Sequence, residues 1–196
     1  MTERNATVER KTKETHVRVE LALDGRGAAH VESAIGFLDH MLDLFAKHGR
    51  FDLTVTAEGD THVDDHHTAE DLGIALGQAI DQALGDRAGI TRFGAASVPM
   101  DEALAQVALD LSGRGFLVLH AEFGQEKIGS FDVALIREFL HALAANARMT
   151  LHVNVPYGDD AHHIAEAIFK AVARALAIAV AIDPRVHGIP STKGVL

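Results

Sequence analysis

A motif that occurs twice limits what this chain can fold into more than any other feature of its sequence. Residues 64–71 read DDHHTAED and residues 161–166 read AHHIAE, so the pattern His-His-x-x-Glu appears in both halves of the chain. Each copy leads into a run of apolar residues at helical spacing, which indicates that both copies lie in the first turns of helices. The chain is therefore expected to consist of two similar halves.

The segments that precede the two motifs are also similar. Residues 50–55 read RFDLTV and residues 148–153 read RMTLHV, and both hexapeptides alternate apolar and polar residues like a half-buried strand. We interpret this similarity as an internal duplication with a boundary near residue 90. Residues 1–90 then form the first half-domain, residues 91–182 the second, and residues 183–196 a C-terminal tail.

Hydrophobic periodicity predicts the order strands, helix, strand, helix in each half. In the first half we expect a strand within 1–23, a returning strand at 28–33, a helix from 37 that ends at His48-Gly49, a strand at 51–56 and the first His-His helix. In the second half we expect strands at 95–98, 103–111 and 116–123, a helix at 133–147, a strand at 149–155 and the second His-His helix. The predicted fold class is α+β, with two pseudo-symmetric half-domains that each have a mixed or antiparallel sheet covered on one face by two helices.

The composition excludes several kinds of site and partner. The chain has no cysteine, so any metal must be held by nitrogen and oxygen ligands. The net charge of −10 and the lack of a Lys/Arg cluster argue against a nucleic-acid partner. The apolar segment 175–182 is too short to span a membrane, and the polar N-terminus lacks the apolar region of a signal peptide. We therefore expect no membrane partner and a cytoplasmic location.

The histidines and glutamates of the two motifs are candidate metal ligands. Residues on a helix follow one another at about 100°, so His66 and Glu70 lie within about 40° of each other and could share a metal. The neighbouring His67 points about 100° away from His66, so the simpler geometry sends the two histidines of a pair to different metals. Two such helices, brought together within a subunit or across an interface, would form two sites with ligands of mixed origin.

Each motif is preceded by another predicted helix, and each of these two helices carries one further histidine, His40 in the first half and His141 in the second. A single histidine there is most simply a half-buried residue, but two of them in matched helices favour a metal role. The candidate ligands are then His40, His66, His67, Glu70, His141, His162, His163 and Glu166. Such a set gives two sites with three nitrogens and one oxygen each, which Mn²⁺, Fe²⁺, Zn²⁺ or Ni²⁺ could all accept. The open positions on each ion favour catalysis over a structural role.

The carboxylates around the first motif and the C-terminal tail have simpler alternatives. Asp64 and Asp65 are at positions where helix capping is the default role, and Asp71 could orient a ligating histidine. The tail, residues 183–196, is too irregular for a helix or a strand. It is either a frayed terminus or a segment that folds over an anionic ligand through its Ser-Thr-Lys sequence at 191–193.

Four sequence stretches resemble one known family. They are FLDHML at 37–42, DDHHTAED at 64–71, AHHIAEAIFK at 161–170 and the ending STKGVL, and they resemble imidazoleglycerol-phosphate dehydratase along essentially the whole chain. The resemblance implies a hydro-lyase of histidine biosynthesis that converts imidazole glycerol phosphate to imidazole acetol phosphate and water. It also implies two divalent metal ions per active site, most simply Mn²⁺, and a homo-oligomeric shell of 24 subunits with active sites at subunit interfaces.

The resemblance also implies roles for individual residues. One ion is expected to bind His40, His67, Glu70 and His163, and the other His66, His141, His162 and Glu166. The expected substrate contacts are Glu14, His40, His48, His66, Glu70, Arg92, Arg114, His162, Lys170, Ser191, Thr192 and Lys193, with the two arginines in loops suited to a phosphate. The candidate base is Glu14, with His48 or Asp101 as acid or relay.

The chemistry gives a reason for two ions. The leaving hydroxyl is next to the imidazole ring, and the proton to be lost, one carbon further, is only weakly acidic. Metals on both ring nitrogens would lower the ring N–H pKa and hold an imidazolate, which can expel hydroxide before a base removes the neighbouring proton.

Two other classes of function remain as alternatives. Residues 62–67, HVDDHH, are similar to the His-x-His-x-Asp-His motif of metal-dependent phosphoesterases, but Asp64 is at a position where that motif requires histidine. A ferritin-like metal carrier would use Glu-x-x-His on long bundle helices, whereas here the order is reversed and strands separate the helices.

Overall fold

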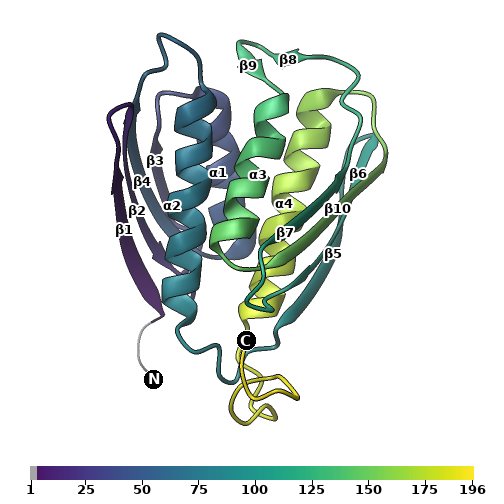
Figure 1. Cartoon of the computed structure of the whole chain (residues 1–196). Helices are drawn as coiled ribbons and strands as arrows, with labels where there is room; N and C mark the ends of the chain where they lie inside the picture. The colour runs from purple at the N-terminus through teal and green to yellow at the C-terminus, as the bar shows by residue number, and fades with distance from the viewer. Residues whose placement is uncertain (1–3) are drawn as a thin grey trace.

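Two four-stranded sheets face each other across a layer of four helices (Figure 1). The computed structural model describes residues 4–196. The first half contains β1 (Asn5–Lys11), β2 (Thr15–Ala22), β3 (Ala29–Glu32), α1 (Gly36–Gly49), β4 (Asp52–Gly59) and α2 (His66–Leu84). The second half contains β5 (Phe93–Met100), β6 (Ala103–Asp110), β7 (Phe116–His120), β8 (Lys127–Ile128), β9 (Phe131–Asp132), α3 (Ala134–Asn146), β10 (Thr150–Tyr157) and α4 (Ala161–Val180).

The two large sheets have the same topology. The first sheet has the order β1-β2-β4-β3 and the second sheet the order β5-β6-β10-β7. In each sheet the fourth strand runs parallel to its neighbour, β3 to β4 and β7 to β10, and the other pairs are antiparallel. The predicted α+β class, with a mixed sheet and two helices in each half, is confirmed. The boundary near residue 90 falls between α2 and β5 and stays a prediction.

The strand expected within residues 1–23 is confirmed by β2, and β1 precedes it in a hairpin whose turn is held by Thr12 Oγ1 accepting from the backbone N–H of Glu14 and Thr15. One local prediction was wrong. Segment 28–33 does not return against the preceding strand, since β3 pairs in parallel with β4. The short hairpin β8–β9 was not predicted because strands of two residues carry too little alternation.

The predicted end of the first helix at His48-Gly49 is confirmed, since α1 ends at Gly49. The left-handed residue that follows is Arg50, with φ 59°. A Cβ at Gly49 would lie 2.3 Å from the ring of Phe51, so this glycine provides space rather than a left-handed turn. Arg148, the counterpart of Arg50 in the second hexapeptide, also has a positive φ of 52°. The matched backbone conformations support the duplication.

The helices pack crosswise between the halves, α1 on α4 and α2 on α3. Gly73 of α2 faces Phe139 and Ala142 of α3, and one turn later Gly77 faces Leu143 and Asn146. Helices α2 and α3 therefore run in the same direction. The starts of α2 and α3, and of α1 and α4, lie at one end of the molecule (Figure 1). Ligands from different halves of the sequence are thereby brought together at that end.

Candidate metal centre

The contact between α1 and α4 joins three of the predicted metal ligands. His162 and Glu166 are one turn apart on α4, and His162 Nε2 lies 3.1 Å from Glu166 Oε1. His40, on the second turn of α1, places its Nε2 3.0 Å from the same oxygen. One ligand atom from each of the three side chains lies within 4.8 Å of the others. We call His40, His162 and Glu166 the α1–α4 triad.

Glu166 is the buried centre of this triad. Burial raises its pKa, but hydrogen bonds from Lys170, His40 and His162 outweigh that effect and lower the pKa to about 2. Lys170 Nζ donates to Oε2, which leaves Oε1 to face the two imidazoles. Two nitrogens and one ionised oxygen that converge in this way fit a divalent cation such as Mn²⁺, Fe²⁺ or Zn²⁺. The residues present therefore fit the metal that the sequence predicts.

A second cluster forms around His67 at the start of α2. His67 Nδ1 lies 3.0 Å from Asp60 Oδ2 and 3.7 Å from Glu14 Oε2. The hydrogen bond with Asp60 and then the charge of Glu14 raise the pKa of His67. His67 and Glu14 were predicted as site residues, but Asp60 was not. It lies in the loop before α2, and no spacing motif in the sequence identifies it.

His163 has a similar carboxylate partner. Its Nδ1 lies 2.7 Å from Glu102 Oε2, and its Nε2 lies 3.7 Å from Asp101 Oδ2. The hydrogen bond with Glu102 raises the pKa of His163. Sequence reasoning missed Glu102, which is in the β5–β6 turn, far from the motif in sequence. The predicted relay Asp101 is exposed in the same turn.

The carboxylates near the motifs mostly have structural roles. Asp64 Oδ1 accepts from the backbone N–H of His66 at 2.8 Å, and Asp160 Oδ1 accepts from that of His162 at 2.7 Å. Capping is therefore confirmed for Asp64, whereas Asp65 makes no side-chain cap bond. Asp71 does not orient a histidine: it is buried and accepts hydrogen bonds from Arg10 and Thr15.

The remaining predicted ligands are not gathered within one chain. His66 and Glu70 are exposed at the start of α2, and His141 is exposed on α3. Among residues 4–196, Glu70 and His141 have no hydrogen-bond or ion-pair partner. The α1–α4 triad combines His40 with two residues that were assigned to the other ion. The division of the eight ligands between two ions stays a prediction for the assembled protein.

The predicted phosphate contacts lie at the other end of the molecule. Arg92 makes two hydrogen bonds to Asp110, at 2.7 and 3.1 Å, and donates to the Pro190 carbonyl at 2.8 Å. The tail is also held by Gly89, whose N–H donates to the Gly188 carbonyl at 2.8 Å. The tail is thus attached to the fold in the described part of the chain, and its residues Ser191, Thr192 and Lys193 lie beyond the C-terminal end of α4 (Figure 1).

The predicted metal ligands and the predicted phosphate contacts are far apart. Helix α4 has 20 residues, so about 30 Å separates its histidine end from the end next to the tail. Arg114 is exposed in the β6–β7 turn, and a Cβ at the neighbouring Gly113 would meet Leu196 of the tail at 2.5 Å. Arg114 therefore belongs to the tail end as well. The predicted metal ligands and the predicted phosphate contacts at the tail end are therefore too far apart to bind one small substrate within a single chain.

His48 and Lys170 lie between the two ends on the α1–α4 contact. Burial lowers the pKa of His48, and the charges of Lys170 and Arg174 lower it further. The role of His48 as acid or relay stays a prediction.

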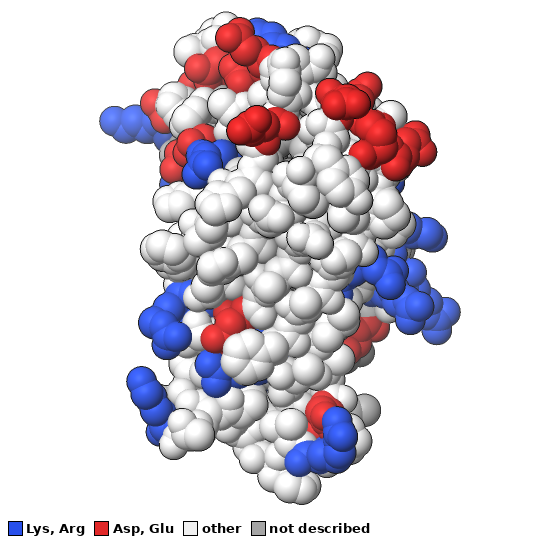
Figure 2. All heavy atoms as spheres, turned by 90° about the vertical axis from the view of Figure 1, so that its right-hand side faces the viewer, with Lys and Arg blue, Asp and Glu red and all other residues white. Residues whose placement is uncertain are grey.

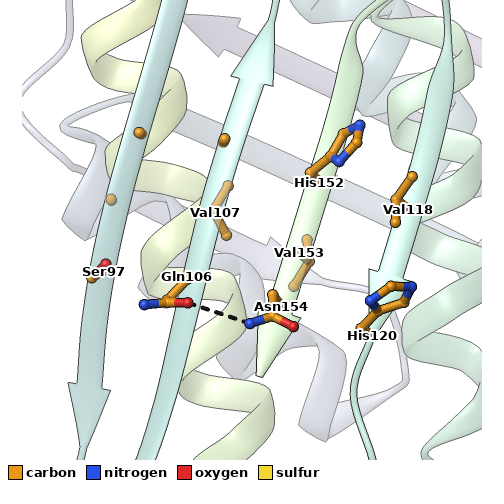
Figure 3. A pocket seen from close by; sticks show the side chains of 11 residues that line it. Ser97, Gln106, Val107, Val118, His120, His152, Val153 and Asn154 are labelled. Carbon is orange, nitrogen blue, oxygen red and sulfur yellow. Dashed lines mark hydrogen bonds between the residues drawn. The ribbon is translucent and has the colours of Figure 1, made fainter. Parts of the chain in front are cut away.

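A shallow concavity on the outer face of the second sheet is distinct from these clusters. Figure 3 shows its lining, with His120 and His152 as the titratable side chains and a hydrogen bond of 3.3 Å between Gln106 and Asn154. It contains no carboxylate, and its histidines are absent from the predicted ligand set. This surface therefore does not match the predicted metal chemistry.

Comparisons with known proteins agree with the geometry. The profile of the family described as imidazoleglycerol-phosphate dehydratase matches residues 33–176. The chain belongs to the imidazoleglycerol-phosphate dehydratase family. The dehydratase of Geobacillus sp. (strain WCH70) is 59% identical over 193 residues, which cover 98% of this chain and 99% of the relative. That of Rhodopseudomonas palustris (strain TIE-1) is 60% identical over 194 residues, with 98% of each chain covered.

Solved structures of the family have the same fold. The imidazoleglycerol-phosphate dehydratase of Staphylococcus aureus subsp. aureus N315 has a TM-score of 0.83 and 38% identity, over 91% of this chain and 99% of that one. The family member from Pyrococcus furiosus, solved in complex with (S)-C348, has a TM-score of 0.84 and 38% identity, over 96% and 100% of the two chains. The predicted family and enzyme class, a hydro-lyase, are confirmed. Among residues 4–196, none of the helices combines the length and apolar composition that a bilayer span requires.

Proposed function

We propose that this protein removes water from imidazole glycerol phosphate to give imidazole acetol phosphate, a step of histidine biosynthesis. The observation that carries the proposal is the α1–α4 triad, in which both halves of a family member contribute nitrogen and oxygen ligands to one point. The proposal includes two divalent metal ions per active site, most simply Mn²⁺. It also places the enzyme in the cytoplasm, since a phosphorylated substrate of this kind does not cross an apolar membrane unaided.

In this proposal some residues bind the metal ions, and another residue accepts a proton from the substrate. The eight predicted ligands would hold the metal ions, which when bound would lower the pKa of the ring N–H of the substrate, so that the deprotonated ring can supply the electron pair that elimination requires. Lys170 keeps Glu166 ionised and oriented through Oε2. Glu14 Oε2, 3.7 Å from His67 Nδ1, is the proposed acceptor for the proton next to the leaving group.

The proposed site requires more than one copy of the chain. The metal ligands and the phosphate contacts Arg92, Arg114 and residues 191–193 are separated by the length of α4, about 30 Å. A substrate that bridges both groups must therefore lie between the histidine end of one copy and the tail end of another. We propose a homo-oligomer in which copies complete each other's sites.

The outer face of the second sheet is the proposed contact surface for another copy. Figure 2 shows this side as a broad area without charged side chains, between acidic groups above and mainly basic groups below. Its outward side chains in the middle include Ala95, Ser97, Ala108 and Val118. The outer face of the first sheet carries charged residues instead: Glu9, Arg18, Glu20, Glu32 and Glu58. This difference in polarity between two faces of equal topology supports the proposal that the second face is the one covered by another copy.

One experiment tests the reaction directly. The purified protein, loaded with Mn²⁺, is incubated with imidazole glycerol phosphate, and ketone product and inorganic phosphate are measured together. We expect stoichiometric ketone and no phosphate. Release of phosphate without ketone would favour the phosphoesterase alternative, and uptake of many metal ions per subunit without turnover would favour the metal-carrier alternative.

A further inference from the structure

The second histidine of each His-His pair uses the same ring atom to contact a carboxylate. His67 Nδ1 is 3.0 Å from Asp60 Oδ2, and His163 Nδ1 is 2.7 Å from Glu102 Oε2. His162, the first histidine of the second pair, instead contacts Glu166 through Nε2. The two second histidines, His67 and His163, thus share a contact between Nδ1 and a carboxylate that the motif alone does not specify.

The two carboxylates come from different parts of the two halves. Asp60 follows β4 in the loop that leads into α2. Glu102 lies between β5 and β6, directly before β6, and its counterpart in the first half is Glu14, which lies in the β1–β2 turn directly before β2. Glu14 Oε2 also faces His67 Nδ1, but at 3.7 Å it is too far for a hydrogen bond, whereas Asp60 Oδ2 is at 3.0 Å. Each half therefore places a carboxylate against Nδ1 of its second histidine, and in the first half the closer one is Asp60.

An ionised carboxylate can only accept a hydrogen bond. The ring nitrogen that faces it must then carry the proton, so Nδ1 of His67 and His163 is the N–H in the neutral ring. The lone pair is left on Nε2, on the opposite edge of the ring. Neutral imidazole binds metals through the nitrogen without a proton, and carboxylates in this position are known to orient ligating histidines.

Both carboxylates are held in place by their surroundings. Glu102 Oε1 accepts from the backbone N–H of Asp160 at 2.9 Å and of Asp159 at 3.2 Å, in the loop that begins α4. Asp60 is confined by a turn in which its carbonyl accepts from the Val63 N–H at 2.7 Å, and its Oδ1 is buried.

The free edge of each ring is open to a ligand. His163 Nε2 has Asp101 Oδ2 at 3.7 Å, too far for a hydrogen bond. His163 and His67 are both only partly buried. A ring fixed on one edge and open on the other has the geometry of a metal ligand that is oriented before the metal arrives.

We propose that Asp60 and Glu102 are positioning residues that fix the tautomer and the orientation of His67 and His163, so that each binds its metal through Nε2. The inference rests on the proposed function and deepens it, because it names the groups behind two predicted ligands. Neither carboxylate ligates the metal. Each acts through the histidine that it contacts.

The test compares variants that keep or remove the hydrogen-bond acceptor. Glu102→Gln and Asp60→Asn keep a carbonyl oxygen that can accept from Nδ1, whereas Glu102→Met and Asp60→Ala remove it. The affinity of each metal-free protein for Mn²⁺ alone is measured by calorimetry. Losing the acceptor should weaken binding by about 10- to 100-fold, with a smaller loss in the amide variants.

Two controls separate this role from general charge and from folding. Asp159→Asn removes a nearby exposed charge that has no contact with the ring, and Glu9→Met removes the acceptor of a carboxylate–histidine contact at His16, outside the ligand set. Both should bind Mn²⁺ within about twofold of the parent protein. Circular dichroism should show folded protein for every variant.

Two results would overturn the proposal. One is equal Mn²⁺ affinity for the parent, Glu102→Met and Asp60→Ala in folded protein. The other is an equal loss in the acceptor-free and amide variants, which would mean that charge alone matters. Either result leaves the proposed function intact as long as the parent protein still forms ketone. Absence of ketone from the parent would instead refute the proposed function.

Discussion

His40 Nε2 and Glu166 Oε1 lie 3.0 Å apart, although 126 residues separate them in the sequence. The contact exists because the first helix of one half packs on the second helix of the other, α1 on α4. The duplication thus produced a shared site rather than two separate ones. Neither half alone can form the α1–α4 triad, so its geometry depends on the packing of the whole chain.

Replacing Glu166 with glutamine should weaken Mn²⁺ binding. The carboxylate is the ionised centre of the triad, with a pKa of about 2, so at neutral pH the substitution removes a full negative charge between two imidazoles. We expect at least about a tenfold loss of affinity, because even residues behind a ligand contribute about 10- to 100-fold. Calorimetry on the metal-free protein measures it. The control is Glu32→Gln, an exposed glutamate near His30, which should leave binding unchanged.

Replacing Gly73 with alanine should destabilise the helix layer. An added Cβ would lie 2.6 Å from the Phe139 carbonyl oxygen and 2.9 Å from the Ala142 Cβ, so α2 and α3 would have to move apart. The gain in helix propensity, about 1 kcal/mol, is smaller than the overpacking cost of about 1–3 kcal/mol. Denaturant unfolding of the metal-free protein should show lower stability. Gly36→Ala, with open space around the added Cβ, should show none of this loss.

Most of the fold could be predicted from the sequence because a pattern found in one half supported the assignment of the matching pattern in the other half. The hexapeptides that begin at Arg50 and Arg148 and the paired motifs gave the helices and strands of both halves. Crosswise packing could not be predicted, since it depends on small residues such as Gly73 and Gly77 whose effect appears only when two helices meet. The α1–α4 triad follows from that packing and not from any local pattern.

The carboxylate partners of the site were missed for a different reason. Asp60 and Glu102 are in loops, where sequence spacing carries no geometric information. Their role depends on where the chain returns in space, as in the contact of Glu102 with the loop before α4. Arg92 was predicted as a phosphate contact and is instead held by Asp110 in the single chain, so its predicted role requires that the pair also accommodate an anion.

Replacing the buried Arg87 with methionine should destabilise the junction between the halves. Its guanidinium donates to the carbonyls of Leu111 at 2.9 Å and Ala147 at 3.0 Å and pairs with Asp81. Methionine fills similar space but leaves these groups unpaired, at a cost of about 3–5 kcal/mol for a broken buried ion pair. Denaturant unfolding measures the loss. Arg185→Met, which breaks an exposed pair with Asp183, should change stability by less than about 1 kcal/mol.

Replacing Lys170 with methionine should raise the pKa of His48. Burial is the largest cause of its lowered value, and the positive charge of Lys170 is the next. Removing that charge makes the imidazolium less unfavourable, so the ring should protonate at a higher pH than in the parent protein. NMR titration of the metal-free protein gives the midpoint, with Lys11→Met as a distant control. A midpoint that does not move, or moves down, would contradict the electrostatic account of His48.

Replacing Ala108 with arginine should disrupt assembly without unfolding the chain. Ala108 is exposed in the middle of the outer face of the second sheet, where its neighbours across the ladder are Ala95 and His152. A charge is tolerated there in a single chain but must be desolvated when another copy covers the face, which is costly without a partner charge. Light scattering should show smaller particles, circular dichroism should stay unchanged, and ketone formation should fall because completed sites are lost. Thr56→Arg, on the charged outer face of the first sheet, should assemble like the parent; if both variants assemble normally, the second sheet is not the contact surface.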